Sequence, residues 1–201
     1  MNKNAEGPVP PKPKPATSIF ASQSTNYNWQ RKDLDYSLEL VTSPRSGRIR
    51  NFNRGKQMFQ KGQCYNCHYM YDKGGSFGPD LTTAGNSFSA EDLLTAILEP
   101  SKDISSRFQA TKFTLKSDDF IVGRIANENA DNYVLQLGYE PANTEELYKS
   151  EVVSTEPSEI SEMPQGLINT MNREEVLDLL YFIIELAGRN KGASQVSIHE
   201  E

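Results

Sequence analysis

The pentapeptide Cys64-Tyr-Asn-Cys67-His68 constrains this chain more than any other stretch, because it holds both cysteines and one of the two histidines among 201 residues. The C-x-x-C-H pattern is the attachment signature for c-type haem. Two thiols one turn apart can add across the two vinyl groups of a haem, and the histidine that follows can bind the iron through a ring nitrogen. We therefore expect one covalent haem c, attached through Cys64 and Cys67, with His68 as an iron ligand.

Three other interpretations of the two cysteines compete with haem attachment. A zinc site needs four ligands, and beyond the pentapeptide only His199 remains, in a polar C-terminal stretch. A thioredoxin-like redox pair would lie in a βαβ context, and no such pattern surrounds the motif. A disulfide between Cys64 and Cys67 would close too small a loop to stabilise the fold much.

Net charge and hydropathy limit the partners and the location of the chain. The formal net charge is −6 at pH 7, which argues against a nucleic-acid partner. The longest apolar run, Leu179–Ile184, is too short to cross a bilayer, so we expect no transmembrane segment. The N-terminus has no apolar region of the signal-peptide kind. Because covalent haem attachment in bacteria occurs outside the cytoplasm, we expect a periplasmic or extracytoplasmic location, with the signal or anchor not present in this chain.

Charge is also unevenly distributed along the chain. Residues 45–56 are basic without an acid, and residues 140–162 are acidic with a single lysine. The pattern predicts either two solvated surfaces or a dipolar molecule that orients a redox partner.

Composition and periodicity divide the chain into five segments. A proline-rich leader over 1–28 is expected to be disordered, and 29–106 is expected to form helices around the cysteine motif. Loosely alternating apolar residues over 107–155 predict an inserted antiparallel β subdomain. The segment 156–188 combines a methionine loop with a final helix, and 189–201 reads as a disordered tail. The expected fold class is mainly α, with this small β insertion.

Capping residues set the expected limits of the helices. Polar N-caps that we expect to begin helices are Asn53, Ser89 and Asn172. Glycines that we expect to end them are Gly62 and Gly188.

A second axial ligand to the iron must come from elsewhere in the chain. The candidates are Met58, Met70, Met163, Met171 and His199. Met70 lies too close to the histidine of the motif to reach the opposite face of the ring. Met163 lies in an extended polar loop before the final helix, a suitable place for a ligand. A lone methionine is more often core filler, so the pattern alone leaves this choice open.

Five motifs occur in an order typical of one family. They are Gly55-Lys-x-x-Phe59, Cys64-Tyr-Asn-Cys67-His68, Gly78-Pro79-Asp80-Leu81, Leu93-Leu94-x-x-Ile97-Leu98-x-Pro100-Ser101-x-x-Ile104 and Met163-Pro164-x-Gly166-Leu167. Across residues 29–187 the chain resembles the haem-binding cytochrome c domain of planctomycete and verrucomicrobial membrane-associated dehydrogenases. The strand-like insertion before the methionine loop is matched in place. The acidic stretch and the proline-rich leader depart from the family pattern.

This resemblance implies a cytochrome c-like helical core of class I type around one covalent haem. Cys64 and Cys67 would form the thioethers, His68 would be the proximal iron ligand and Met163 the distal one. The carbonyl of Pro79 would accept a hydrogen bond from the second ring nitrogen of His68 and orient the ring.

The implied function is electron transfer and not enzymatic catalysis. Phe59 and Tyr181 would form the aromatic contact between the first and last helices. Electrons would arrive from a dehydrogenase, fused or docked, and leave to a downstream cytochrome or oxidase. One alternative is a haem enzyme or a gas or redox sensor with an open sixth coordination site. Another is a binding module that uses the inserted sheet, with Phe113, Phe120 and Tyr133 exposed, although their alternating spacing favours a core.

Overall fold

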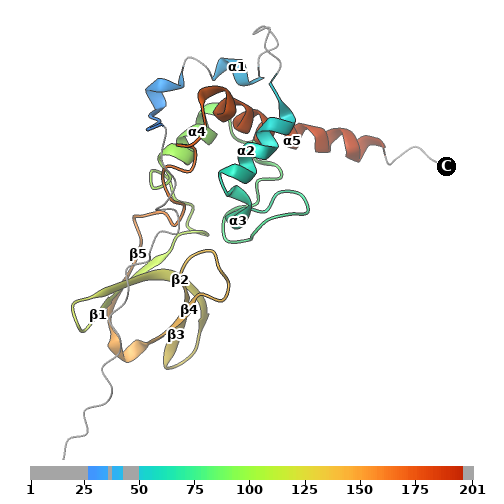
Figure 1. Ribbon diagram of the computed structural model, residues 1–201. Helices are drawn as coiled ribbons and strands as arrows, with labels where there is room; N and C mark the ends of the chain where they lie inside the picture. The colour runs from blue at the N-terminus through green and yellow to red at the C-terminus, as the bar shows by residue number, and fades with distance from the viewer. Residues whose placement is uncertain (1–26, 36–37, 43–49, 197–201) are drawn as a thin grey trace, which may run out of the picture.

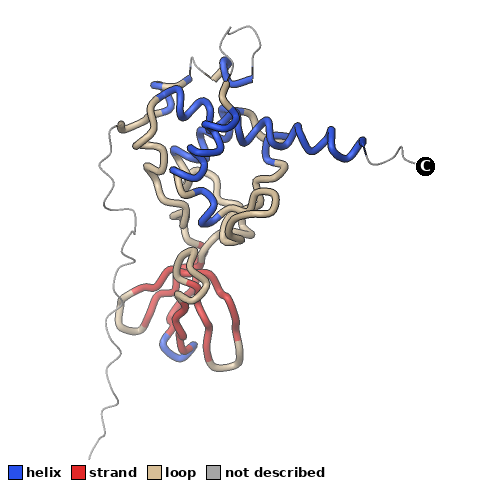
Figure 2. Tube along the Cα trace, turned by 45° about the vertical axis from the view of Figure 1, so that its right-hand side comes forward, coloured by secondary structure: helices blue, strands red, loops and turns tan. Residues whose placement is uncertain are grey.

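A computed structural model describes residues 27–35, 38–42 and 50–196 of the chain. The α-helices and the strands lie at opposite ends of the molecule (Figure 1), and loops lie where the two ends meet (Figure 2). The helical elements are η1 (Arg31–Asp33), α1 (Glu39–Thr42), α2 (Phe52–Lys61), α3 (Cys64–Cys67), η4 (Ala84–Asn86), α4 (Ala90–Leu98), η5 (Lys149–Glu151) and α5 (Arg173–Val196). The strands are β1 (Thr111–Leu115), β2 (Phe120–Glu128), β3 (Asn132–Gln136), β4 (Thr144–Tyr148) and β5 (Val152–Pro157).

The expected mainly α fold class, with its cytochrome c-like helical core, is wrong. The described residues include a five-stranded antiparallel sheet beside the helices. The alternating segment supplies all five strands, whereas the described residues before α2 form only short turns of helix. The fold is therefore a mixed one, in which the sheet is a major part and not a small addition.

The sheet has the strand order β4-β3-β2-β1-β5 and a hydrophobic core of its own. Phe113 in β1 is paired with Ile121 in β2 on one side and with Thr155 in β5 on the other. Phe113, Ile121, Leu135 and Leu147 are buried together on one face, separate from the core of the helices. Phe113 is fully buried and Tyr133 packs against this cluster, whereas Phe120 is exposed.

The helical end is organised around α5, which crosses α2 closely. A Cβ atom at Gly55 in α2 would lie 2.1 Å from the carbonyl oxygen of Asp178, so only glycine fits at this crossing. The ring of Phe59 meets that of Phe182 edge to face, with centroids 5.6 Å apart. The expected aromatic partner of Phe59 in the last helix, Tyr181, is therefore wrong by one position, and Tyr181 is only partly buried against the same core.

Polar side chains cap the N-termini of α2 and α4. The side chain of Asn51 accepts a hydrogen bond from the amide of Arg54, so the predicted cap at Asn53 is wrong and Asn53 lies inside α2. Ser89 caps α4 through a reciprocal pair of hydrogen bonds with Asp92, as the sequence predicts.

The two ends of α5 differ in how well the sequence predicts them. Asn172 and Glu175 bond each other's backbone amides with their side chains, as expected of a cap. Gly62 ends α2, but Gly188 does not end α5, which continues to Val196. A glycine inside a helix costs about 1 kcal/mol, which neighbouring helix formers can offset.

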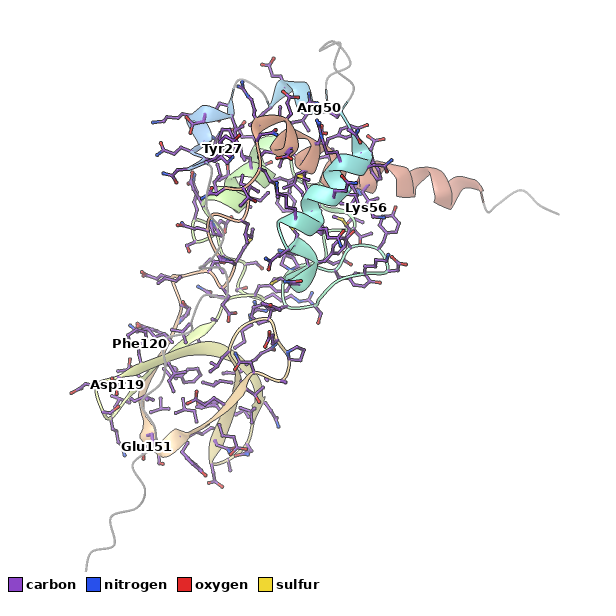
Figure 3. The ribbon with its side chains drawn as sticks, in the orientation of Figure 1. Tyr27, Arg50, Lys56, Asp119, Phe120 and Glu151 are labelled. Atoms are coloured by element: carbon purple, nitrogen blue, oxygen red, sulfur yellow. The ribbon has the colours of Figure 1, made fainter. Side chains whose placement is uncertain are left out.

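Charged side chains near the start of α2 are paired with α5. Arg50 (labelled in Figure 3) is buried and lies 2.8 Å from a carboxylate oxygen of Glu174. Arg54 lies 2.6 Å from the buried carboxylate of Asp178. These two members of the basic stretch 45–56 therefore pair α2 with α5, Arg50 as a buried side chain and Arg54 as a partly exposed one. Residues 45–49 lie outside the described residues.

No helix within the described residues is both long and apolar enough to span a bilayer. Of the leader expected over 1–28, residues 1–26 lie outside the described residues. Tyr27 donates its backbone amide to the carbonyl of Asn169 and stacks on Trp29, so the chain at residues 27–29 is packed against the segment before α5.

Candidate functional site

The cysteine motif forms a single helical turn, α3, directly after α2. Gln63 adopts a left-handed backbone conformation with φ of 59° and turns the chain between the two helices. Cys64 and Cys67 are half-buried, free thiols at the two ends of this turn. The amide of His68 donates to the carbonyl of Cys64 at 2.8 Å and closes the turn. Both sulfurs and the histidine therefore emerge from one short, hydrogen-bonded unit.

The ring of His68 is held by the loop that follows the motif. Its Nδ1 lies 2.8 Å from the carbonyl oxygen of Pro79, the hydrogen bond that the family resemblance implies. Because a carbonyl only accepts, the ring proton lies on Nδ1 and the lone pair on Nε2. Gly78 lets the loop pass beside the ring, since a Cβ there would lie 2.7 Å from both Nδ1 and Cε1.

Two more glycines bring this loop onto the backbone of the motif. A Cβ at Gly74, whose φ is +104°, would lie 2.1 Å from the carbonyl oxygen of His68. A Cβ at Gly75 would lie 2.3 Å from the carbonyl oxygen of Asn66. The amide of Gly75 donates to the carbonyl of Tyr65 at 2.8 Å. The glycines that the sequence marks only as a loop therefore fix the motif from one side.

Burial sets the protonation states of the three motif side chains. It raises the pKa of the Cys64 thiol to about 12 and is also the main reason that the pKa of Cys67 is raised. Both sulfurs are therefore thiols at neutral pH. Burial lowers the pKa of His68, against an opposing effect of the bond to Pro79, so the ring is neutral. A neutral imidazole is the form that binds a metal.

The described methionines fall into two groups. Met58, Met70 and Met171 are buried in the hydrophobic core of the helices, where they fill space. Met163 is only half-buried and does not belong to that core. Its side chain is therefore the methionine most available to a ligand. His199 lies outside the described residues.

An ion pair brings the segment around Met163 towards the motif. Arg124 in β2 lies 2.6 Å from the carboxylate of Glu162, and both groups affect the pKa of Cys67, which Arg124 lowers and Glu162 raises. Arg124 also stacks on the ring of Phe77 at 3.7 Å and donates to the Phe77 carbonyl. Burial raises the pKa of Glu162, and Arg124 opposes that shift.

Sequence reasoning missed Arg124, Glu162 and Phe77. Arg124 is one charged residue on the outward face of a strand, and Glu162 is one of many acids in its stretch. The one feature of the sequence that could have pointed to Phe77 and Glu162 is that each directly precedes a predicted site residue or pair, Gly78-Pro79 and Met163 respectively.

The residues present suit a covalently held haem better than a bare metal ion. No group of three or more His, Cys, Asp or Glu side chains in the described part of the chain could hold a metal. Two free thiols, a neutral histidine with Nε2 unprotonated and a half-buried thioether are the donor types that a c-type haem uses. These assignments remain predictions.

Comparison with known proteins adds no family assignment. No protein-family model matches this chain. No curated protein matches it either. The resemblance drawn from the five motifs therefore stands on those residues alone.

Proposed function

We propose that this chain is a monohaem c-type cytochrome, or a cytochrome domain, that carries single electrons from a dehydrogenase to a downstream respiratory acceptor. One observation carries the proposal. Two reduced thiols and the following histidine project from a single turn, and a carbonyl oxygen 2.8 Å from Nδ1 keeps the other ring nitrogen unprotonated.

Each residue of the site has a separate role in this proposal. Cys64 and Cys67 would hold the haem through thioethers, and Nε2 of His68 and the sulfur of Met163 would bind the iron. Pro79 orients the imidazole and makes it a better ligand. When bound, the haem supplies a one-electron redox centre whose potential the thioether ligand raises. Because both axial positions would be taken by protein groups, no position is left for a substrate.

The proposed partners follow from this chemistry. The electron donor is a dehydrogenase, either fused or docked, and the acceptor is a downstream cytochrome or oxidase. Contacts between redox partners are usually small and transient. The proposed location is periplasmic or extracytoplasmic, where thioether formation takes place.

The first test is pigment retention. The protein is produced with haem-attachment machinery, treated with acid acetone and assayed as a pyridine haemochrome. We expect one covalent haem per chain, and Cys64→Ser with Cys67→Ser to abolish it. Colourless wild-type protein, produced alongside a known c-type cytochrome that matures normally, contradicts the proposal.

The second test separates electron transfer from the enzyme or sensor alternative. Leucine is close to methionine in volume but has no sulfur, so each substitution removes a thioether with little change in packing. Met163→Leu tests the proposed ligand, and Met58→Leu and Met171→Leu are controls at buried core positions. We expect only Met163→Leu to lose the absorption of the iron–thioether bond and to lower the reduction potential. Wild-type ferrous protein that is high-spin and binds CO without displacing a ligand would instead indicate an open sixth position.

A further inference from the structure

Arg124 contacts the loop that holds the His68 ring and the loop that carries Met163. Phe77 directly precedes the Gly78-Pro79 pair that holds His68, and Glu162 directly precedes Met163. The guanidinium of Arg124 stacks on the Phe77 ring at 3.7 Å and donates to the Phe77 carbonyl. Its Nε donates to the carboxylate of Glu162 at 2.6 Å. One side chain from the sheet therefore touches both the residue before the Gly78-Pro79 pair and the residue before Met163.

Burial distinguishes this ion pair from the other ion pairs of the sheet. The side chains of Arg124 and Glu162 are 20% and 14% exposed, and Phe77 is buried beside them. The Lys149–Glu128 pair is 31% and 49% exposed. A planar guanidinium that stacks and donates in several directions holds its partners in a fixed geometry, which an exposed lysine pair does not.

The Met163 loop is tied to the sheet end and to the segment before it by further bonds. The amide of Ser158, at the end of β5, donates to the carbonyl of Ala110 at 2.8 Å. The amide of Ser161 donates to the hydroxyl of Ser101 at 3.0 Å, and the amide of Met163 donates to the hydroxyl of Ser161. These bonds hold the stretch from Ser158 to Met163, on the N-terminal side of the proposed ligand, and the Arg124 pair holds Glu162, the residue next to it.

We propose that Arg124 is a positioning residue, which holds the Pro79 and Met163 loops at a set separation and so keeps the methionine on the iron. The inserted sheet is then the support of the sixth ligand and not a separate binding module. This inference rests on the proposed function, because it concerns ligation of a bound haem. It adds a role for residues that the cysteine motif does not contain.

The test compares four variants of the full, haem-loaded chain. Arg124→Gln removes the charge and the stacking, Arg124→Lys keeps the charge, and Glu162→Gln removes the partner charge with little change of shape. Lys149→Gln is the control, because it breaks an ion pair of the same sheet with Glu128, away from the described contacts of the motif. Covalent haem content, the iron–thioether absorption, ferrous CO affinity and amide hydrogen exchange are measured for each.

CO competes with the methionine sulfur for the iron, so its apparent affinity reports how firmly Met163 is held. We expect Arg124→Gln and Glu162→Gln to raise that affinity about tenfold or more, the usual scale for losing a group that supports a metal ligand. Arg124→Lys should fall between them and wild type. Hydrogen exchange at the amides of Gly78 and Met163 should be faster in Arg124→Gln and in Glu162→Gln than in wild type. In Lys149→Gln the exchange and the CO affinity should equal those of wild type. Covalent haem content should be unchanged in all four variants.

Failure of this inference differs from failure of the proposed function. Wild-type protein without covalent haem overturns the proposed function. Haem-loaded wild type with an iron–thioether bond, together with CO affinities in Arg124→Gln and Glu162→Gln equal to that of Lys149→Gln, overturns the positioning role alone. If Arg124→Gln does not fold, Glu162→Gln and Arg124→Lys decide by the same measurement. A loss of thermal stability without a change in CO affinity also counts against positioning.

Discussion

Replacing Gly78 by alanine would place a methyl group against the ring of His68. The added Cβ would lie 2.7 Å from Nδ1 and from Cε1, and 3.2 Å from Nε2. Carbon atoms in contact are normally about 3.5–4.0 Å apart, so the ring or the loop must retreat by about 1 Å. The Nδ1–carbonyl distance to Pro79 is 2.8 Å, and lengthening it by a shift of that size takes it beyond the range of a hydrogen bond.

Two costs follow from this displacement. Losing the hydrogen bond removes about 1 kcal/mol, and crowding a packed site costs about 1–3 kcal/mol. We therefore expect Gly78→Ala to lower the free energy of unfolding by about 2–4 kcal/mol. Urea unfolding followed by the fluorescence of Trp29 measures this, because Trp29 packs on the helical core and its indole donates to the Met171 carbonyl.

Gly62→Ala is the matched control for this variant. Gly62 has an ordinary φ of −74°, and the atom nearest to an added Cβ is the flexible end of Met171, at 3.1 Å. Its stability should change by less than about 1 kcal/mol. If Gly78→Ala unfolds at the same urea concentration as this control, and the ring signals of His68 do not move, the proposed packing of loop against ring is wrong.

Two further predictions concern the helical end. Asp178→Ala should lower stability by about 3 kcal/mol in urea unfolding, because among the described residues it leaves Glu174 as the one acidic partner of the buried Arg50. The exposed-pair variant Lys149→Gln should cost less than about 1 kcal/mol. Equal losses would contradict the role of the buried cluster. Hydrogen bonds from Ser89 lower the pKa of Asp92, so its stabilising contribution is present above the unfolded pKa and is lost as pH falls through the folded one. Asp92→Asn should therefore flatten the decline of stability at acid pH, and Ser89→Ala should cost about 1 kcal/mol at neutral pH; an unchanged acid profile in Asp92→Asn would contradict this account.

Local patterns predicted the local features of this structure well. Ser89 with Asp92, and Asn172 with Glu175, are caps whose partners lie three residues apart, so a short window contains the whole interaction. The cap of α2 was misplaced because Asn51 and Asn53 are both suitable, and the choice depends on contacts with α5. Asn51 also donates its amide to the carboxylate of Asp178, a contact that no local window contains.

The fold class was wrong for a related reason. Strand-like alternation over 107–155 predicts the strands, but it does not predict how large a part of the fold they form. Five strands pair into a sheet whose hydrophobic core, which includes Phe113 and Leu135, is separate from that of the helices. The segment is therefore stabilised by its own buried side chains. The stretch before α2 shows only a weak helical rhythm, and its described residues form short turns instead of long helices.

The same distinction between local and distant contacts explains what could be foreseen of the candidate site. The thiols and the histidine lie within one turn of chain, which is the spacing that the proposed haem attachment needs, so the sequence displays them together. Arg124 is 47 positions from Phe77 and 38 from Glu162 in the sequence, and no pattern in that spacing predicts their contact. A site that needs one ligand from a contiguous motif and another from a distant loop must fix the distance between them by tertiary structure. In this chain the sheet lies between those two stretches in sequence and contacts the neighbours of both, which is the placement that such a support requires.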